Sequence, residues 1–248
     1  MKMILLTLLM SSVWGQTGLE IAKMVDEKPT PRDMVNTTNM VLTNSKGKTR
    51  TNVMMSRSID GNKKQIIWFL EPKDDRGVAF LKIEHNNKDD EMRMWLPAFK
   101  KVRRISSKRK GDAFMGSDLS YEDLTSRDLN EYTYKRLDDE LVNSSQCFVL
   151  ESKPNTSAKS SYSKHISWIN KENLNIVQEY SFDKRGALKK EKYFQHNKLK
   201  DYYVMNQIRV KDVQKQHTTE VTFESLEVDT GINPALFQEK NLKRIPKN

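Results

Sequence analysis

The stretch TRTNVMMSRSIDGNKKQIIWFLEPKDDRGVAFLKIE, residues 49–84, sets the pattern for most of the chain. It predicts three β-strands, which are separated by the turn residues 60–62 (Asp-Gly-Asn) and by the segment from Pro72 to Gly77. The same period-two alternation begins at residue 36 and recurs in segments such as TNMVLTN and DEMRMWLP. We therefore expect about ten consecutive antiparallel strands in one curved sheet, because a sheet of that size tends to coil or close.

Composition bounds the rest of the architecture. Only 36% of the 248 residues are hydrophobic, which suits a sheet with one dry face better than layers buried on both sides. Helical spacing is found over residues 18–28, residues 111–128 indicate a loop with short helical turns, and the tail 232–245 suggests a last helical turn whose apolar residues would dock on the sheet. Since no shift in composition divides the sheet, we expect one domain over residues 16–248, mainly β, with a few short helices.

The first residues, MKMILLTLLMSSVWGQ, are typical of a secretory signal peptide. Lys2 precedes an apolar run that is too short to span a bilayer, which needs ~20 residues, and small residues follow up to Gly15. We expect a signal peptide over residues 1–15 and export of the remainder. Cys147, the only cysteine, is far from the cleavage point and cannot carry a lipoprotein's lipid. Its surroundings indicate a small apolar strand residue.

The residues that usually carry catalysis are not grouped in this sequence. His85, His165, His196 and His217 have no metal-ligand spacing, and their polar surroundings predict exposed side chains. No GxSxG motif and no glycine-rich phosphate loop occurs, and paired aspartates fall at predicted turns, where Asp bonds its own backbone. We therefore expect no enzyme, no catalytic residue, no metal site and no cofactor.

The net charge is +10, and one basic run lies between two segments that contain aromatic residues. The cations of this run are Lys100, Lys101, Arg103, Arg104, Lys108, Arg109 and Lys110. Phosphate binding is one interpretation. Export, the lack of an aromatic stacking platform, and the apolar Val102 and Ile105 within the run argue against nucleic acid. The alternatives are a solvated sheet edge, which would also discourage aggregation, and a rim that contacts headgroups or a partner.

Alternate residues of the predicted strands give an apolar face that is rich in Met, a flexible side chain suited to irregular apolar surfaces. Its members are Met40, Leu42, Ile66, Trp68, Leu70, Ala79, Leu81, Ile83, Met92, Met94 and Leu96. A helix, a partner or a ligand must cover such a face, and the predicted helices are few. A barrel or half-barrel can hold a lipophilic ligand there. An ordinary filled core satisfies the same pattern, and periodicity does not choose between them.

Four stretches, in this order, resemble the bacterial outer-membrane lipoprotein-sorting protein family, which is LolA-like and belongs to the LolA/LolB superfamily. They are FLEPKDDRGVAFL (69–81), MWLPAFKKVRRISSKRKGDAFMGSDLSYEDL (94–124), YSKHISWINKEN (162–173) and FDKRGALKK (182–190). The specific parts are F-x-x-P-x-D-x-x-G-x-x-F-L and F-M-G-S-D-x-S-Y-E-D-L. The resemblance implies an unclosed half-barrel formed by one curved antiparallel sheet, covered by short α-helices, with a hydrophobic cavity for acyl chains. The family offers no catalytic residues to carry over.

The resemblance also implies a function, namely a periplasmic carrier or chaperone that binds lipoprotein acyl chains or other lipids for transfer toward the outer membrane. Its candidate partners are an inner-membrane transporter, an outer-membrane acceptor and anionic headgroups. The expected headgroup or partner contacts are Lys100, Lys101, Arg103 and Arg104. The expected ligand-binding residues are Met40, Leu42, Ile66, Trp68, Leu70, Leu81, Ile83, Met92, Met94, Leu96, Phe114 and Met115.

In this interpretation residues 94–99 form a strand with a dry face, 100–110 its charged continuation and 111–124 a lid segment. Phe114, Met115 and Leu119 would point toward the cavity. The acids of the lid segment would stay solvated or pair with nearby Arg; they are Asp118, Glu122 and Asp123. One alternative function is an envelope sensor or protein-interaction module that uses the same fold (RseB-like), and another is a polyanion binder through residues 100–110.

Overall fold

The computed structural model describes residues 15–86 and 88–246. Within them, α1 (Gly18–Asp26) precedes the strands β1 (Asp33–Thr43), β2 (Thr49–Ile59), β3 (Lys64–Glu71), β4 (Ala79–Ile83), β5 (Glu91–Leu96), β6 (Lys101–Ile105), β7 (Tyr132–Val142), β8 (Ser145–Pro154), β9 (Lys164–Asn170), β10 (Ile176–Phe182), β11 (Leu188–Leu199), β12 (Tyr202–Asp212) and β13 (His217–Val228). Short 3-10 helices follow β5, β6 and β13 and flank the loop before β7: η1 (Pro97–Phe99), η2 (Ser107–Arg109), η3 (Glu122–Leu124), η4 (Leu129–Glu131), η5 (Pro234–Leu236) and η6 (Glu239–Lys243).

The expected signal peptide, residues 1–15, lies outside the described residues except for Gly15. In the part of the chain that the structure describes, no helix is long and apolar enough to cross a membrane.

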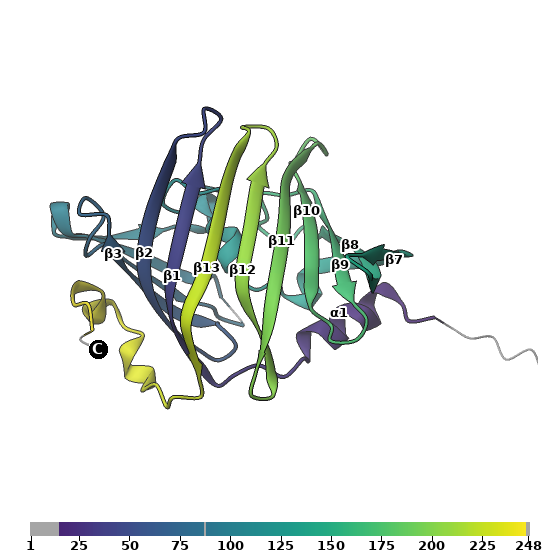
Figure 1. The fold of residues 1–248 in the computed structure, drawn as a ribbon, viewed down its shortest axis with the longest axis horizontal. Coiled ribbons are helices and arrows are strands. Elements are labelled where there is room, and N and C mark those ends of the chain that lie inside the picture. The colour runs from purple at the N-terminus through teal and green to yellow at the C-terminus, as the bar shows by residue number, and fades with distance from the viewer. Residues whose placement is uncertain (1–14, 87, 247–248) are drawn as a thin grey trace, which may run out of the picture.

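The described strands form one antiparallel sheet in the order β6-β5-β4-β3-β2-β1-β13-β12-β11-β10-β9-β8-β7 (Figure 1). The first and last strands pair at its centre, where Met40 of β1 lies opposite Val221 of β13 and Asn52 of β2. From this centre one meander runs outward to β6 and another to β7, and the sheet curves around α1 without closing. The predicted mainly β class and unclosed half-barrel are confirmed, with more strands than expected.

The first predicted hairpin turn shows how local sequence sets this topology. Asp60, Gly61 and Asn62 connect β2 to β3 with φ angles of 57°, 61° and 71°. Glycine adopts this left-handed region freely, and Asn and Asp tolerate it better than other residues do. Three such residues in succession therefore end one strand and reverse the chain into the next.

We call the sheet face that carries α1 the inner face. On β1–β5 this face packs against the lid segment (residues 111–124). The Phe114 ring of the lid segment lies 6.0 Å from the Phe69 ring, 5.3 Å from Phe80 and 5.8 Å from Tyr121, measured between centroids. The lid segment consists of turns, an Ala113–Ser120 bridge and η3, which confirms the expected loop with short helical turns.

The C-terminal segment (residues 229–245) covers the opposite, outer face of β2–β5, as the yellow ribbon beside β2 and β3 shows (Figure 1). Phe237 and Leu242 are 4% and 0% exposed and belong to one apolar cluster with Trp68 and Leu81. The predicted docking of the tail on the sheet is confirmed. Because the lid segment and the tail cover opposite faces, β3 is buried on both sides and residues 66–69 are all buried in succession.

The helix α1 covers the inner face at the other end of the sheet. It begins with a capping box, in which the Glu20 N–H donates to Thr17 Oγ1 at 3.3 Å and the Thr17 N–H donates to Glu20 Oε2 at 2.7 Å. Ile21 and Ala22 are buried against β8 and β9. Gly18 lies so close to β7 that a Cβ there would be 2.8 Å from a backbone nitrogen, so a larger residue would push the helix away.

Candidate functional site

A pocket of about 580 Å³ lies on the inner face between α1, the lid segment and strands β8–β12. We call it the inner pocket, and its volume is in the range of ligand-binding cavities. One wall is apolar, formed by Ala22, Val25, Leu129, Leu150, Ile169, Ile176, Phe194 and Ile208. It exists because α1 covers one end of the sheet and the lid segment covers the other, and neither fills the space between them.

Another part of the lining of the inner pocket is charged. Arg127 donates two hydrogen bonds of 2.7 Å to the carboxylate of Glu179 on β10. Lys192 on β11 contacts Glu179 at 3.1 Å and Asp123 of the lid segment at 2.5 Å. Lys190 on β11 completes the set with a 2.6 Å contact to Asp123. We call these five side chains the ion network; it joins the lid segment, and Arg127 three residues beyond its end, to β10 and β11.

The carboxylates of the ion network are almost completely buried from solvent. The side chains of Asp123 and Glu179 are 2% and 4% exposed. Burial alone would raise the pKa of Asp123, but Lys192 and Lys190 hold it well below its ordinary value. Burial likewise opposes ionisation of Glu179, and Arg127 and Lys192 hold its pKa well below the ordinary value. Both carboxylates are therefore ionised at neutral pH, and the network carries three cations against two anions.

Two buried groups extend the network. Lys190 donates to the Tyr162 hydroxyl at 2.7 Å, and that hydroxyl donates to Asp123 at 2.9 Å. Burial, reinforced by the charge of Asp123, raises the pKa of Tyr162 well above its ordinary value. His165 lies beside Tyr162 and bonds Ser181 through Nδ1 at 2.9 Å. Burial, followed by Arg127, lowers the pKa of His165 well below its ordinary value, so this histidine is neutral.

The lid segment has a second polar attachment, on β4. Lys82 is fully buried on the inner face, where its Nζ donates to the Leu124 carbonyl and to Glu84 Oε1, both at 2.6 Å. Together with the ion network, this fixes the end of the lid segment to strands on both sides of the inner pocket. Among these attachments, Asp123, Glu179 and Lys192 also line the inner pocket.

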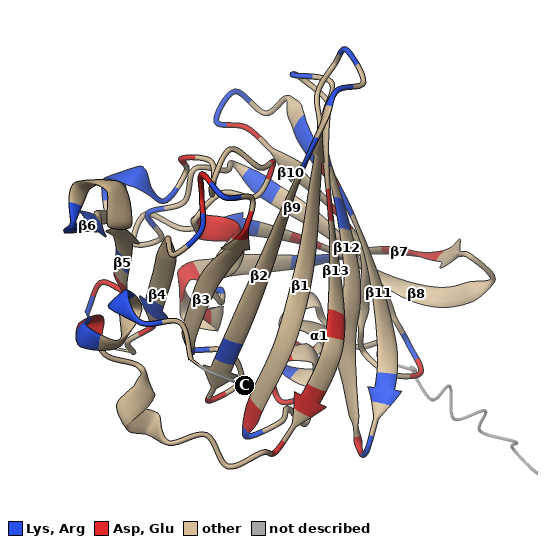
Figure 2. Cartoon of the chain, turned by 60° about the vertical axis from the view of Figure 1, so that its left-hand side comes forward, with Lys and Arg blue, Asp and Glu red and all other residues tan. Residues whose placement is uncertain are grey.

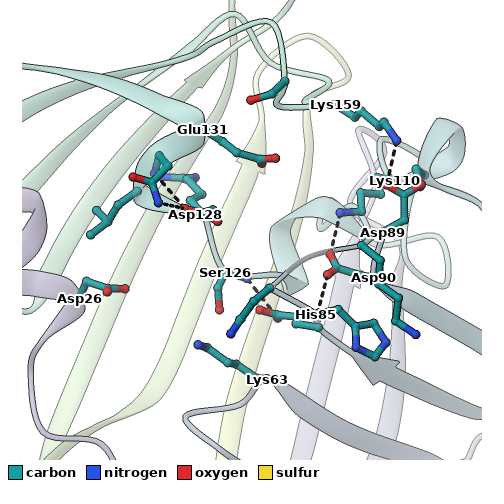
Figure 3. A pocket seen from close by; sticks show the side chains of 18 residues that line it. Asp26, Lys63, His85, Asp89, Asp90, Lys110, Ser126, Asp128, Glu131 and Lys159 are labelled. Atoms are coloured by element: carbon teal, nitrogen blue, oxygen red, sulfur yellow. Dashed lines mark hydrogen bonds and ion pairs between the residues drawn. The ribbon is translucent and has the colours of Figure 1, made fainter.

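A second pocket, of about 660 Å³, adjoins the inner pocket and is lined mainly by charged and polar side chains (Figure 3). We call it the charged pocket. Lys110 pairs with Asp90 at 2.7 Å, and Lys159 with Asp89 at 2.8 Å. The two pockets share the lining residues Asp26, Lys63, Ser126, Arg127 and Leu129. An amphiphile could therefore occupy both.

The structure separates the twelve residues that were expected to share one apolar, ligand-binding face, so that expectation of a single face is wrong. Five lie on the outer face with the C-terminal segment: Ile66, Trp68, Leu70, Leu81 and Ile83. Seven lie in the inner cluster with the lid segment: Met40, Leu42, Met92, Met94, Leu96, Phe114 and Met115. None of the twelve lines the inner pocket. The predicted alternation is present in the strands. Because β3 and β4 carry apolar residues on both faces, the assignment of their alternate residues to the ligand-binding face was wrong.

The basic run occupies the β6 edge of the sheet (Figure 2). Lys100 begins it in a left-handed turn with φ 49°, and Lys101, Arg103 and Arg104 on β6 are exposed. Val102 packs on the outer cluster, while Ile105 is buried in the inner one. The predicted charged, wet continuation is thus confirmed. Contact of these cations with headgroups or a partner stays a prediction.

Several expectations for polar residues are wrong. His165 was expected to be exposed and is 1% exposed. Asp118 of the lid segment is not solvated: its carboxylate accepts from Thr219 Oγ1 at 2.7 Å and lies 2.7 Å from His217 Nδ1. Asp123 pairs with lysines rather than with arginine. Lys190 and Lys192 alternate with polar residues in LKKEKYF, a pattern that normally indicates a solvated face, so the sequence held no signal for their burial.

Residues 15–86 and 88–246 contain no group of three His, Cys, Asp or Glu side chains that could hold a metal ion. Cys147 is a buried strand residue, as predicted, and burial raises the pKa of its thiol.

The comparisons with known proteins agree with this geometry. A family model with the description "-like: Uncharacterized protein" matches residues 61–244. A structure from Vibrio parahaemolyticus, assigned as an outer membrane lipoprotein-sorting protein domain, is 33% identical; the match covers 92% of this chain and 98% of that one, with a TM-score of 0.86. A DUF1329 family protein from Desulfovibrio piger is 29% identical over 91% of this chain and 97% of that one, also with a TM-score of 0.86.

A LolA superfamily protein from Nitrosomonas europaea, 16% identical, covers 91% of this chain and 99% of that one with a TM-score of 0.71, which supports the fold alone. No curated protein matches the chain.

Proposed function

The chain belongs to the LolA-like family of outer-membrane lipoprotein-sorting protein domains, and from this premise we propose that it is a carrier that binds acyl chains of a lipoprotein or another lipid in the inner pocket. It would act without catalysis, in the periplasm, and deliver its cargo toward the outer membrane. An inner-membrane transporter and an outer-membrane acceptor are its proposed exchange partners.

The observation that carries this proposal is the inner pocket itself. About 580 Å³ of space is lined in part by apolar side chains from α1, from Leu129 and from strands β8–β12. Burying a methylene group of an acyl chain against such a wall contributes roughly 0.8 kcal/mol. A chain of a dozen or more carbons therefore has enough apolar surface to bind well without specific polar contacts.

The lid segment supports a way to enlarge the site. The inner-cluster residues under it include Met40, Met92 and Met94, and the lid segment itself adds Met115. Methionine adapts to irregular apolar shapes, so this surface could accept an acyl chain in place of the Phe114 ring. In the proposal, a long acyl chain or a second acyl chain displaces the lid segment and then contacts the predicted ligand-binding residues on the inner face.

The basic β6 edge supports a docking role during transfer. Its exposed cations are Lys100, Lys101, Arg103 and Arg104. Among the described residues, none of these four forms an ion pair with a carboxylate. Anionic headgroups or an acidic acceptor would be attracted to such an edge, and the attraction would weaken with added salt.

Solvent extraction of purified protein, followed by mass spectrometry, tests the carrier role directly, and uptake of a fluorescent fatty acid quantifies it. Val25→Trp should reduce probe uptake by filling the inner pocket from α1. Leu141→Trp makes the same kind of change at a side chain that is 63% exposed at the β7 edge, and it should leave uptake unchanged. Folded protein that retains no lipid and binds no probe would refute the proposal.

One observation favours the alternative of an envelope sensor or protein-interaction module. The protein's own Phe114 and Tyr121 fill the inner face of β2–β5, so that half of the hollow is occupied. Co-purification of one stoichiometric protein partner, together with empty extracts, would support this alternative over the carrier.

A further inference from the structure

The charged pocket bears on the kind of lipid that the site accepts. It meets the inner pocket along a shared boundary to which Asp26, Lys63 and Arg127 contribute. A ligand with its acyl chain on the apolar wall would pass this boundary and place its headgroup in the charged pocket. The charges that remain free there would then decide which headgroup binds.

Most charges of the charged pocket are already used within the protein. Lys110, Lys159 and Lys88 pair with Asp90, Asp89 and Glu91. Glu84 is held by Lys82, while Arg127 binds Glu179 with two hydrogen bonds and keeps a side chain that is 30% exposed. These pairs neutralise one side of the pocket, so they give it little preference for either sign of charge.

Four charges of the pocket form no ion pair among the described residues: Lys63, Asp26, Asp128 and Glu131. Figure 3 shows them around one opening, apart from the paired Lys110 and Lys159. One cation against three carboxylates leaves a net negative charge. This opening therefore disfavours a headgroup that is only anionic, and it favours one that carries an ammonium group.

The charges also have an order along the path from the inner pocket. Lys63, Asp26 and Arg127 lie at the shared boundary, where Arg127 is 30% exposed and already paired with Glu179, whereas Asp128 and Glu131 line only the charged pocket. A phosphodiester linked to acyl chains would meet Lys63 and the exposed part of Arg127 first, and an ammonium group beyond it would reach Asp128 and Glu131. Phosphoethanolamine has its groups in this order.

We propose that the charged pocket selects cargo with a zwitterionic phosphate–ammonium headgroup, as in phosphatidylethanolamine, with the phosphate at Lys63 and Arg127 and the ammonium at Asp128 and Glu131. This inference rests on the proposed carrier function. It names the class of cargo and assigns the charged pocket a role that the apolar wall cannot supply.

The test uses delipidated full chain loaded with a fluorescent fatty acid, and measures displacement by dihexanoyl phosphatidylethanolamine and by dihexanoyl phosphatidylglycerol. The ethanolamine lipid should displace the probe at roughly tenfold lower concentration at low salt, because two exposed ion pairs supply that much discrimination. The double variant Asp128→Asn, Glu131→Gln should lose this preference, and it should bind the anionic probe at least as tightly as wild type, because two carboxylates are removed. Asn keeps the helix-capping ability of Asp128, whose Oδ1 accepts from the Asn130 N–H.

Two further variants separate the parts of the site. Lys63→Gln should weaken displacement by both lipids, since both carry the phosphate, and Asp112→Asn, outside both pockets, should change nothing. Equal displacement by the two lipids, or a preference that survives in the double variant, would overturn this inference and leave the carrier role intact. Failure of the probe to bind at all would instead refute the carrier role and this inference together.

Discussion

Asp123 joins the lid segment to the sheet through charge, so the removal of that charge alone is a direct test of the ion network. Its carboxylate contacts Lys190 at 2.6 Å and Lys192 at 2.5 Å and accepts from the Tyr162 hydroxyl at 2.9 Å. Asp123→Asn preserves the size of the side chain. It leaves Lys190 without a carboxylate partner in a site where that lysine side chain is only 4% exposed.

The size of the effect follows from burial. Removing one partner of a buried ion pair costs about 3–5 kcal/mol, because an uncompensated charge remains in the interior. That is a large part of a typical free energy of unfolding of about 5–15 kcal/mol. Asp112→Asn is the matched control, since Asp112 pairs with Arg109 at 2.7 Å where the side chains are 47% and 51% exposed. Such exposed pairs contribute ~1 kcal/mol or less.

Urea unfolding at pH 7, followed by tryptophan fluorescence, measures the free energy of unfolding of each variant. The ionised forms of Asp123 and Glu179, whose pKa values are lowered in the folded state, contribute stability above the ordinary carboxyl range of about 4. This contribution is lost as the pH falls through the lower folded values. The difference in free energy of unfolding between wild type and Asp123→Asn should therefore be constant from about pH 8 to 5 and should become smaller below about pH 4.

A loss no larger than that of Asp112→Asn would refute the reasoning. It would mean that the lysines find other partners or that water reaches the network. A difference that stays the same far into acid would contradict the ionised state of Asp123 in the folded protein. A double-mutant cycle with Lys192→Met separates the pairwise coupling from general damage, and coupling of about 0.5–3 kcal/mol is expected for residues in one network.

Gly18→Ala should lower the free energy of unfolding and make α1 sensitive to protease, because the added Cβ would lie 2.8 Å from the β7 backbone. Leu19→Ala, at an exposed position, is the control, and a Gly18→Ala variant as resistant to protease as this control would contradict the prediction. Leu242→Ala should cost about 2–5 kcal/mol, because this fully buried side chain packs on the outer face; an unchanged urea midpoint would argue against the tail's role. Burial, followed by Lys28, lowers the pKa of His196 to about 4. The contribution of the neutral imidazole to stability is therefore present above about pH 6.5 and declines toward pH 4. An NMR titration midpoint of His196 near the ordinary histidine value would contradict the lowered pKa.

The overall architecture could be read from the sequence because strand alternation and turn chemistry are local properties. The Asp60-Gly61-Asn62 turn and the alternation around it need no knowledge of distant residues. The tail was also predictable, since Phe237 and Leu242 are apolar residues that need a dry surface.

The faces of the strands could not be read in the same way. In β3, residues 66–69 are apolar without interruption and all buried. Such a run indicates a strand covered on both sides. Choosing every second residue of it assigned Ile66 and Trp68 to the inner face, although they lie under the C-terminal segment. Only the packing of the lid segment and the tail on opposite faces decides which residue points inward.

The charged wall of the inner pocket was beyond sequence reasoning for a different reason. Lys190 and Lys192 are buried because Asp123, far away in the chain, meets them across the inner face. Neither the spacing nor the neighbours of these lysines records that partner. The same holds for Arg127, which lines both pockets, and its partner Glu179.

The pairing of β1 with β13 has a consequence for how the molecule is made. During synthesis β1 exists long before the last strand leaves the ribosome, so only its β2 side can be satisfied at first. Its other backbone edge stays open to pairing with foreign chains. The pairing of β1 with β13 joins segments from opposite ends of the chain, and such non-local contacts are associated with slower folding. A chain that lacks β13 therefore presents β1 as an exposed edge strand, which is prone to aggregation.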